Sequence, residues 1–134
     1  MSLQFRGIFN KGKPNLERIE FEALASLNLS FYTVLHSTAI GDGVASGSHP
    51  AFWFPSVSLS AGMQINLFTG SNLAPAKIDA RYNFFWGLKQ TIFNTATDCI
   101  VLIQAVNWQT GRVDPPAGLP NNGVRLGDLM TGRK

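Results

Sequence analysis

Short segments in which apolar and polar residues alternate place the strongest constraint on what this chain can fold into. In Ile19–Ala23 the apolar side chains alternate with Glu20 and Glu22, and in Met63–Phe68 methionine, isoleucine and leucine alternate with glutamine and asparagine. A period of two places successive side chains on opposite faces of a β-strand, so that one face is buried and the other meets solvent. Glycine, proline, asparagine and serine separate these segments at short intervals, which is typical of an all-β domain.

The pattern predicts an immunoglobulin-like antiparallel β-sandwich of about seven to nine short strands, with a closed barrel as the alternative. Leu16, Ile19, Ala23 and Leu27 also fall at helical spacing, and we prefer a strand over Ile19–Ala23 to a helix over 16–27. The aliphatic run Cys99–Ile103 predicts a central strand that is buried on both faces. Further strands are predicted over Leu27–Leu35, Ala51–Pro55, Tyr82–Trp86, Thr91–Phe93 and after Trp108–Gly111, with a flexible loop over Ala39–Pro50.

The length of 134 residues corresponds to one domain. A chain of this size buries enough surface to be stable without disulfides, and the single cysteine, Cys99, allows no intramolecular bridge. Prolines, glycines and Asn121-Asn122-Gly123 dominate the C-terminus. We therefore expect a β-sandwich domain over residues 1–114 and an irregular tail over 115–134.

Formal charge is sparse in the middle of the chain. The net charge is +3, and between Ala23 and Ala76 only Asp42 is charged. So neutral a stretch either lies in the core or forms a surface that a partner covers. No apolar run is long enough for a membrane span, and no signal peptide precedes the domain, so we expect a cytoplasmic protein by default. Export stays open if the natural chain begins further upstream.

Two segments, taken in order, resemble the lamin-tail domain, an immunoglobulin-like β-sandwich. The first comprises Phe52-Trp53-Phe54-Pro55 and Leu59–Leu67, and it is similar to the family's aromatic-Phe-Pro strand and its small-Gly turn. The second comprises Trp86 and Ile92–Leu102, and it is similar to the family's Asn-containing turn, acidic residue and following strand. The resemblance spans roughly residues 5–114 and implies the immunoglobulin-like fold. Because the family is diverse in what it binds, the resemblance implies no single ligand.

Aromatic residues are the first candidates for a functional surface. Two aromatic strands contribute more large rings than one face of each strand can hold, so some of them should point outward. We expect Trp53, Tyr82, Phe84 and Trp86 to form an exposed interaction surface. Exposed aromatic patches mark protein interfaces and also serve as stacking platforms for sugars or bases.

The segment from Asn94 to Asp98 predicts a structural turn, in which the Asn and Asp side chains accept backbone N–H groups between two strands. The two histidines, His36 and His49, have no short metal-ligand spacing, so we expect no metal site and no cofactor.

Catalytic motifs are lacking in the sequence, and we expect that the protein is not an enzyme. Cys99 opens the most apolar strand, where burial makes a thiol inert, and no serine lies in a Gly-x-Ser-x-Gly elbow. Glu20 and Glu22 lie about 6.6–7 Å apart by strand rise, a spacing that a glycosidase uses, but they fit an ordinary solvated face.

Three functions follow in order of preference. The first is a non-catalytic module that binds a protein partner or a copy of itself through a charge-poor aromatic surface. The second is a module that binds polysaccharide or nucleic acid, and the third is a small metal-dependent hydrolase around His36 and His49. We also expect the tail to pack on its own domain or on a partner copy, because Val124, Leu126, Leu129 and Met130 are apolar.

Overall fold

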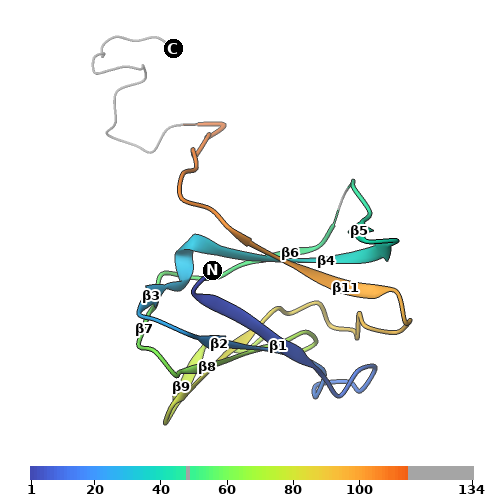
Figure 1. The fold of residues 1–134 in the computed structure, drawn as a ribbon, viewed down its shortest axis with the longest axis horizontal. Coiled ribbons are helices and arrows are strands. Elements are labelled where there is room, and N and C mark those ends of the chain that lie inside the picture. Colours follow the sequence, from blue (N-terminus) through green and yellow to red (C-terminus); the bar gives the residue numbers. More distant parts are fainter. Residues whose placement is uncertain (48, 115–134) are drawn as a thin grey trace.

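The computed structural model describes residues 1–47 and 49–114, and this part of the chain is all-β (Figure 1). Its eleven strands are joined by turns, and one 3₁₀ turn lies at Leu29–Phe31. The predicted tail over 115–134, including its expected docking, lies outside the described residues. The strands are β1 (Leu3–Phe9), β2 (Arg18–Ala23), β3 (Leu27–Asn28), β4 (Tyr32–Ile40), β5 (Gly43–Val44), β6 (Ala51–Trp53), β7 (Ser58–Leu59), β8 (Gln64–Phe68), β9 (Ala76–Ile78), β10 (Arg81–Phe85) and β11 (Asp98–Gln104).

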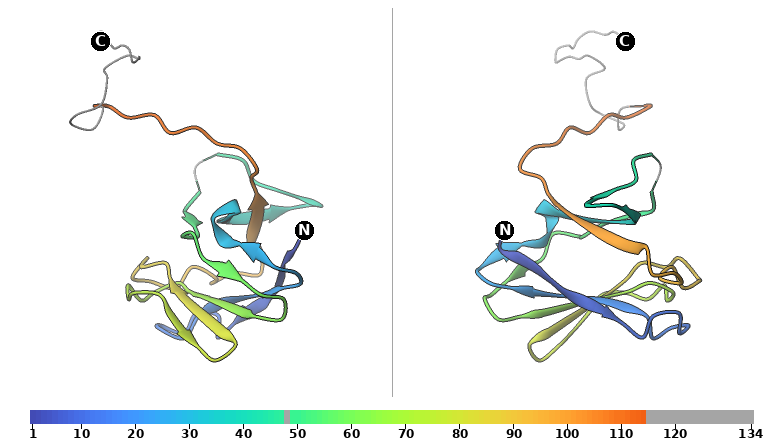
Figure 2. Two further views of the ribbon diagram at one scale, coloured as in Figure 1. Left: turned by 90° about the vertical axis from the view of Figure 1, so that its left-hand side faces the viewer. Right: turned by 45° about the vertical axis from the view of Figure 1, so that its right-hand side comes forward.

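Two main sheets lie in layers, as expected of a β-sandwich (Figures 1 and 2). The first sheet has the strand order β1-β2-β8-β10-β9, and the second has the order β11-β4-β5, with β6 also paired to β4. Strands β3 and β7 form a separate two-stranded pair. The core lies between the two main sheets, and it is built from inward-facing residues of both. Its fully buried side chains include Ile19, Phe21, Ile65, Leu67 and Phe84 from the first sheet and Tyr32 and Val34 from the second.

The first sheet is mixed, which corrects the prediction of a purely antiparallel sandwich. Strand β8 pairs with β2 antiparallel but with β10 in parallel, and β9 turns back antiparallel on β10. Residues 69–80, which include β9, carry the chain back so that β10 can run in the same direction as β8. Strand β1 was not predicted, because a β-bulge between Phe5 and Gly7 shifts its alternation partway along.

Strand β11 lies at the edge of the second sheet. The sequence predicted a central strand buried on both faces, and this prediction is wrong, because β11 pairs only with β4 and its residues are half-buried or exposed. Aliphatic residues on its inner face, Ile100 and Leu102, pack against the core. Those on its outer face are part of the molecular surface.

The strands predicted from alternation at 19–23, 51–55, 63–68 and 82–86 are confirmed, and the helical alternative for 16–27 is wrong where β2 lies. The predicted strand 27–35 is interrupted, because the Asn28 side chain accepts the Ser30 N–H and starts the 3₁₀ turn. The predicted loop over 39–50 contains the short strand β5 and the end of β4. Residues 105–114 hold no strand, so the last predicted strand is also wrong.

Glu17 explains why Thr91–Phe93 is not the strand that the sequence predicted. This carboxylate is 1% exposed and accepts the Ile92 and Phe93 backbone N–H groups at 2.8 and 3.1 Å. It also accepts the Gly12 N–H at 2.9 Å and the Thr69 hydroxyl at 2.7 Å. The backbone donors of 92–93 are thus satisfied by a side chain instead of a neighbouring strand.

The 1–47 and 49–114 ranges contain no helix of the length and apolar character that a membrane crossing requires.

Candidate functional site

An exposed aromatic cluster lies on the outer side of the second sheet. Trp53 is 53% exposed, Trp108 is 47% exposed and Phe31 is 39% exposed. The Trp108 ring packs edge-on against Trp53, with centroids 5.2 Å apart, and against Phe31, with centroids 5.8 Å apart. The Trp53 indole N–H donates to the Ser30 carbonyl at 2.6 Å, which fixes the orientation of the ring. We call Phe31, Trp53 and Trp108 the aromatic cluster.

The sheet surface next to this cluster carries no charged side chain. Register and alternation decide which residues face outward, since Val34, Phe52, Ile100 and Leu102 of the same strands pack on the core. The remaining residues of β4, β6 and β11 around them therefore form one outer face, on which Ile103 is 39% exposed. We call this the outer apolar face; its residues are Thr33, Leu35, Ala51, Trp53, Val101 and Ile103.

The structure places Trp53 on the surface, but it does not place the other three predicted aromatic residues there. Phe84 is fully buried, with its ring 5.2 Å from that of Phe54. Tyr82 and Trp86 lie on the same inner face of the chain and pack partly buried against the core. Their prediction as exposed residues is corrected, because a two-layer core takes inward-facing rings from both sheets. The outward residue among their neighbours is Phe85, which stacks on Phe68.

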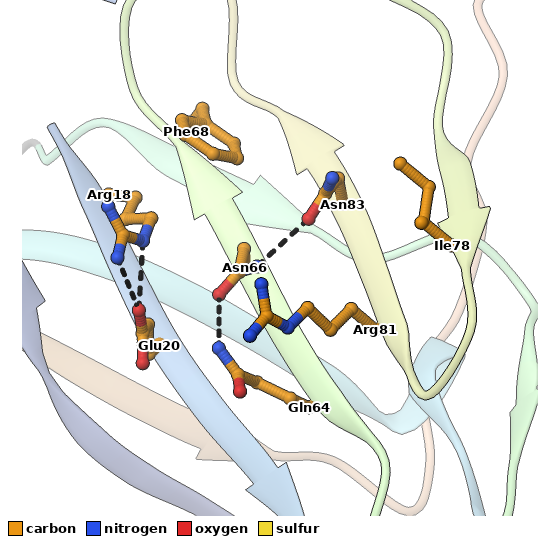
Figure 3. A pocket seen from close by; sticks show the side chains of 8 residues that line it. All are labelled: Arg18, Glu20, Gln64, Asn66, Phe68, Ile78, Arg81 and Asn83. Atoms are coloured by element: carbon orange, nitrogen blue, oxygen red, sulfur yellow. Dashed lines mark hydrogen bonds and ion pairs between the residues drawn. The ribbon is translucent and has the colours of Figure 1, made fainter. Parts of the chain in front are cut away.

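A groove of about 360 Å³ lies on the outer face of the first sheet, where the sequence indicated only solvated positions (Figure 3). An amide chain lies along it: Gln64 donates to Asn66 Oδ1 at 3.0 Å, and Asn66 donates to Asn83 Oδ1 at 2.9 Å. Asn66 is 5% exposed, which makes it the best-fixed polar group of the groove. The groove is lined by Arg18, Glu20, Gln64, Asn66, Phe68, Ile78, Arg81 and Asn83.

Charged side chains stand on two sides of this groove. On β2, the Arg18 guanidinium pairs with Glu20 at 2.8 Å and also lies over the Phe9 ring, 5.2 Å from its centroid. On β10, Arg81 extends over β8 toward the amide chain, and no acid of the described ranges lies within ion-pair distance of it (Figure 3). The groove therefore offers hydrogen-bonding amides and a guanidinium to a ligand that carries hydroxyl or carboxylate groups.

The predicted turn is built around Asp98. Its carboxylate Oδ2 accepts the Asn94 N–H at 2.9 Å, the Thr95 N–H at 2.8 Å and the Thr95 hydroxyl at 3.1 Å. The Asn94 side chain bonds back to Thr91 instead of to a later N–H. Asp98 Oδ1 lies 3.1 Å from Nε2 of His36, whose ring packs edge-on against Phe93. Turn and histidine together fasten the start of β11 to β4.

Stability should depend on pH through Asp98. Desolvation raises the pKa of this carboxyl. Hydrogen bonds from the Thr95 and Asn94 N–H groups, from the Thr95 hydroxyl and with His36 lower it by more, so the pKa lies below the ordinary 3.8. A carboxyl whose pKa is lowered in the folded state stabilises the protein at pH values above its ordinary pKa. This stabilisation is lost as the pH falls through the folded-state pKa.

We therefore expect Asp98→Asn to lower the melting temperature at pH 6, and the difference from the wild type to shrink as the pH falls below the ordinary pKa of 3.8. The control is Asp42→Asn, because Asp42 lies exposed in a turn. Thermal melts across this pH range test the prediction, and an Asp98→Asn difference that stays constant with pH would contradict it.

The two histidine side chains have different hydrogen-bond partners. Nε2 of His36 faces Asp98, whereas Nε2 of His49 lies 2.9 Å from the Ala45 carbonyl oxygen. Within residues 1–47 and 49–114, no group of three or more His, Cys, Asp or Glu side chains is placed to hold a metal ion. Cys99 is half-buried on β11, and Glu20 and Glu22 pair with Arg18 and Arg6 respectively.

Comparison with protein-family models and with curated proteins identifies no relative of this chain. The chain matches no protein-family model, and no curated protein matches it.

Proposed function

We propose that this chain is a non-catalytic interaction module that binds a protein partner, or a copy of itself, through the aromatic cluster and the outer apolar face. We infer that its layers form an immunoglobulin-like sandwich of the lamin-tail kind, in keeping with the sequence resemblance. The observation that carries the proposal is the exposure of Trp53 and Trp108 in mutual contact beside a sheet face without charge.

Energetics support a binding role for this surface. Large apolar side chains exposed together on a small domain are typical of interfaces, and tryptophan is prominent among the residues that dominate binding energy. The hydrogen bond from Trp53 to Ser30 and the ring contacts with Trp108 hold the indoles before a partner arrives. A surface that is ordered in advance loses less side-chain entropy on binding.

A non-catalytic role is supported by how the polar groups are used. The carboxylates of Glu17 and Asp98 accept backbone N–H groups, and both fix loops to strands. The sequence offers no nucleophile motif beside them. These groups are best explained as structural.

Replacement of Trp53 by glutamate should abolish partner binding while leaving the fold intact, because a charge in the outer apolar face cannot be desolvated cheaply. The matched control is Phe85→Glu, which places the same charge beside an aromatic ring on the other sheet. The measurement is chemical cross-linking and capture from an extract of the source cell, followed by mass spectrometry. Proteins retained by the wild type and by Phe85→Glu, but lost with Trp53→Glu, are the expected result. Equal loss with both variants would contradict the proposal.

A second candidate function is polysaccharide binding in the groove of the first sheet, and the fixed amide chain Gln64-Asn66-Asn83 is the observation that favours it. Planar amide and guanidinium groups bond pairs of neighbouring hydroxyls, and Phe68 supplies an apolar surface at the end of the groove. Nucleic acid is less well supported, because Arg6 and Arg18 are paired with acids.

If the groove binds polysaccharide, neutral and acidic polysaccharides embedded in a native gel should retard the wild-type chain. Arg81→Ala should restore most of the mobility, because Arg81 is exposed and is the groove's unpaired cation in the described ranges. The control is Lys77→Ala, which removes a charge from the neighbouring strand β9 outside the groove lining. Equal mobility of all three proteins in every polysaccharide would exclude this second function.

A further inference from the structure

We propose that two copies of this chain pair antiparallel along the free edge of β11, so that their second sheets join into one continuous sheet. The inference rests on the proposed function in that the chain acts by contact with another protein. It goes beyond it by naming the partner and by using a sheet edge instead of the outer apolar face.

The backbone groups on this edge are identified by the ladder between β11 and β4. Thr97 accepts the Ala39 N–H and Ala105 donates to Phe31, so the odd-numbered residues between them bond to β4. The N–H and C=O groups of Ile100, Leu102 and Gln104 therefore point away from β4, toward the free edge. Within the described residues, these groups take part in no backbone hydrogen bond.

The other edge strands of the two main sheets are short, bulged or charged, and β5 has only two residues. Strand β1 has a bulge and the charged Arg6 at its middle. Strand β9 is three residues long and contains Lys77, and β6 is three residues long and is followed closely by Pro55. Charge, bulges, proline and shortness are the usual protections of an edge strand. Strand β11 has seven residues, a regular register and no charge between Cys99 and Gln104.

A second copy fits this edge because antiparallel pairing of β11 with itself is self-complementary about a two-fold axis. Full overlap of Asp98–Gln104 centres the pair on Val101, which then faces its own counterpart, and Ile100 lies opposite Leu102. Between Cys99 and Gln104 the edge carries no charge, and in this register Asp98 lies opposite the uncharged Gln104 of the second copy, although the chain carries +3 overall. Residues 105–108 lead away from this edge, since Trp108 packs toward Trp53 and Phe31.

The joined sheet would also bring the two outer apolar faces side by side. Val101 and Ile103 lie on that face, at the junction between the copies. Pairing at β11 thus doubles the apolar surface that the proposed function assigns to a partner.

Site-directed cross-linking tests the pairing. In the Cys99→Ser background, Val101→Cys introduces thiols that lie across the two-fold axis at a non-hydrogen-bonded pair, where Cα atoms are about 4.5 Å apart and a disulfide can form. The matched control is Leu35→Cys in the same background, because Leu35 neighbours Val101 on the same face but belongs to the central strand β4. Dimers that form rapidly with Val101→Cys and not with Leu35→Cys are the expected result. Faster cross-linking of Leu35→Cys would mean that the copies stack by their faces, and it would overturn the edge pairing while supporting the proposed function.

Sedimentation of the unmodified chain gives a test that requires no variant to fold. We expect a concentration-dependent dimer, and Val101→Lys should weaken it by about tenfold or more, because like charges then face each other across the axis. Leu35→Lys, which adds the same charge away from the edge, should weaken it less. A wild type that stays monomeric would refute the pairing, even if Trp53→Glu still loses a captured protein. A dimer that appears only after truncation at Asp114 would assign the edge to the C-terminal segment and also overturn the inference.

Discussion

Replacement of Glu17 by alanine should lower the free energy of unfolding by about 3–5 kcal/mol. The Glu17 carboxylate is buried and accepts hydrogen bonds from three backbone N–H groups and one hydroxyl, which belong to Gly12, Thr69, Ile92 and Phe93. Removing it leaves several buried donors without an acceptor, and each such donor costs its desolvation free energy. Urea denaturation followed by tryptophan fluorescence measures the change.

Two further variants define the origin of this effect. Glu22→Ala removes a carboxylate that pairs with Arg6 on the exposed side of β2, and it should cost no more than about 1 kcal/mol. Glu17→Gln keeps the shape but offers one acceptor oxygen, so its loss should lie between those of the two alanine variants. If Glu17→Ala and Glu22→Ala are equally stable, the hydrogen bonds of Glu17 do not hold its neighbouring segments together as we propose.

Phe84→Ala should cost about 3–5 kcal/mol, the usual range for deletion of a fully buried ring. The Phe84 ring contacts Phe54 at 5.2 Å and stacks on Tyr82 at 4.9 Å, so its loss leaves a cavity between the two sheets. Phe85→Ala is the matched control, because the adjacent residue points to the opposite face and stacks on Phe68 there.

Denaturation midpoints of the two variants should therefore differ widely, with Phe85→Ala the milder change by about 2 kcal/mol. Equal losses, or a larger loss with Phe85→Ala, would show that the strand faces are assigned the wrong way round.

The alternation of apolar and polar residues was sufficient to predict the strands that bury one face along their whole length. In β2 and β8 each inward residue is buried and the outward ones, apart from Phe68, are polar, so the period of two is plain in the sequence. The same rule failed for β1 and for residues 27–35. There a bulge and an Asn28-capped turn, both set by local backbone geometry, change the face partway along.

Partners distant along the chain were not predictable from the pattern. The run Cys99–Ile103 has the composition of a central strand, yet its neighbour on one side is β4 and its other side is an edge. A sheet is completed by pairings that no local pattern encodes, and the parallel pairing of β8 with β10 is another example. The role of Glu17 was missed for a similar reason, because its four donors come from three separate segments.

The candidate surface was predicted in part. Trp53 is exposed as expected, because its neighbours Phe52 and Phe54 turn into the core. Tyr82, Phe84 and Trp86 were assigned outward because an alternating strand cannot turn all of its rings inward. The core does hold them, since rings from both sheets meet there in tilted and edge-on contacts. The residues that join Trp53 in the aromatic cluster are Phe31 and Trp108. Phe31 lies in a turn and Trp108 in an irregular segment, so no periodicity in the sequence indicates that they are exposed.

Hydroxyl-radical footprinting tests the central claim most directly, because it compares both candidate surfaces in one experiment. The chain is oxidised alone at low concentration, and again at the same concentration when bound to a captured protein. Our account predicts that oxidation of Trp53 and Trp108 falls severalfold on binding, while that of Phe68 and Phe85 on the other sheet is unchanged. Protection of Phe68 and Phe85 with Trp53 and Trp108 still fully reactive would contradict it, and would assign binding to the groove of the first sheet.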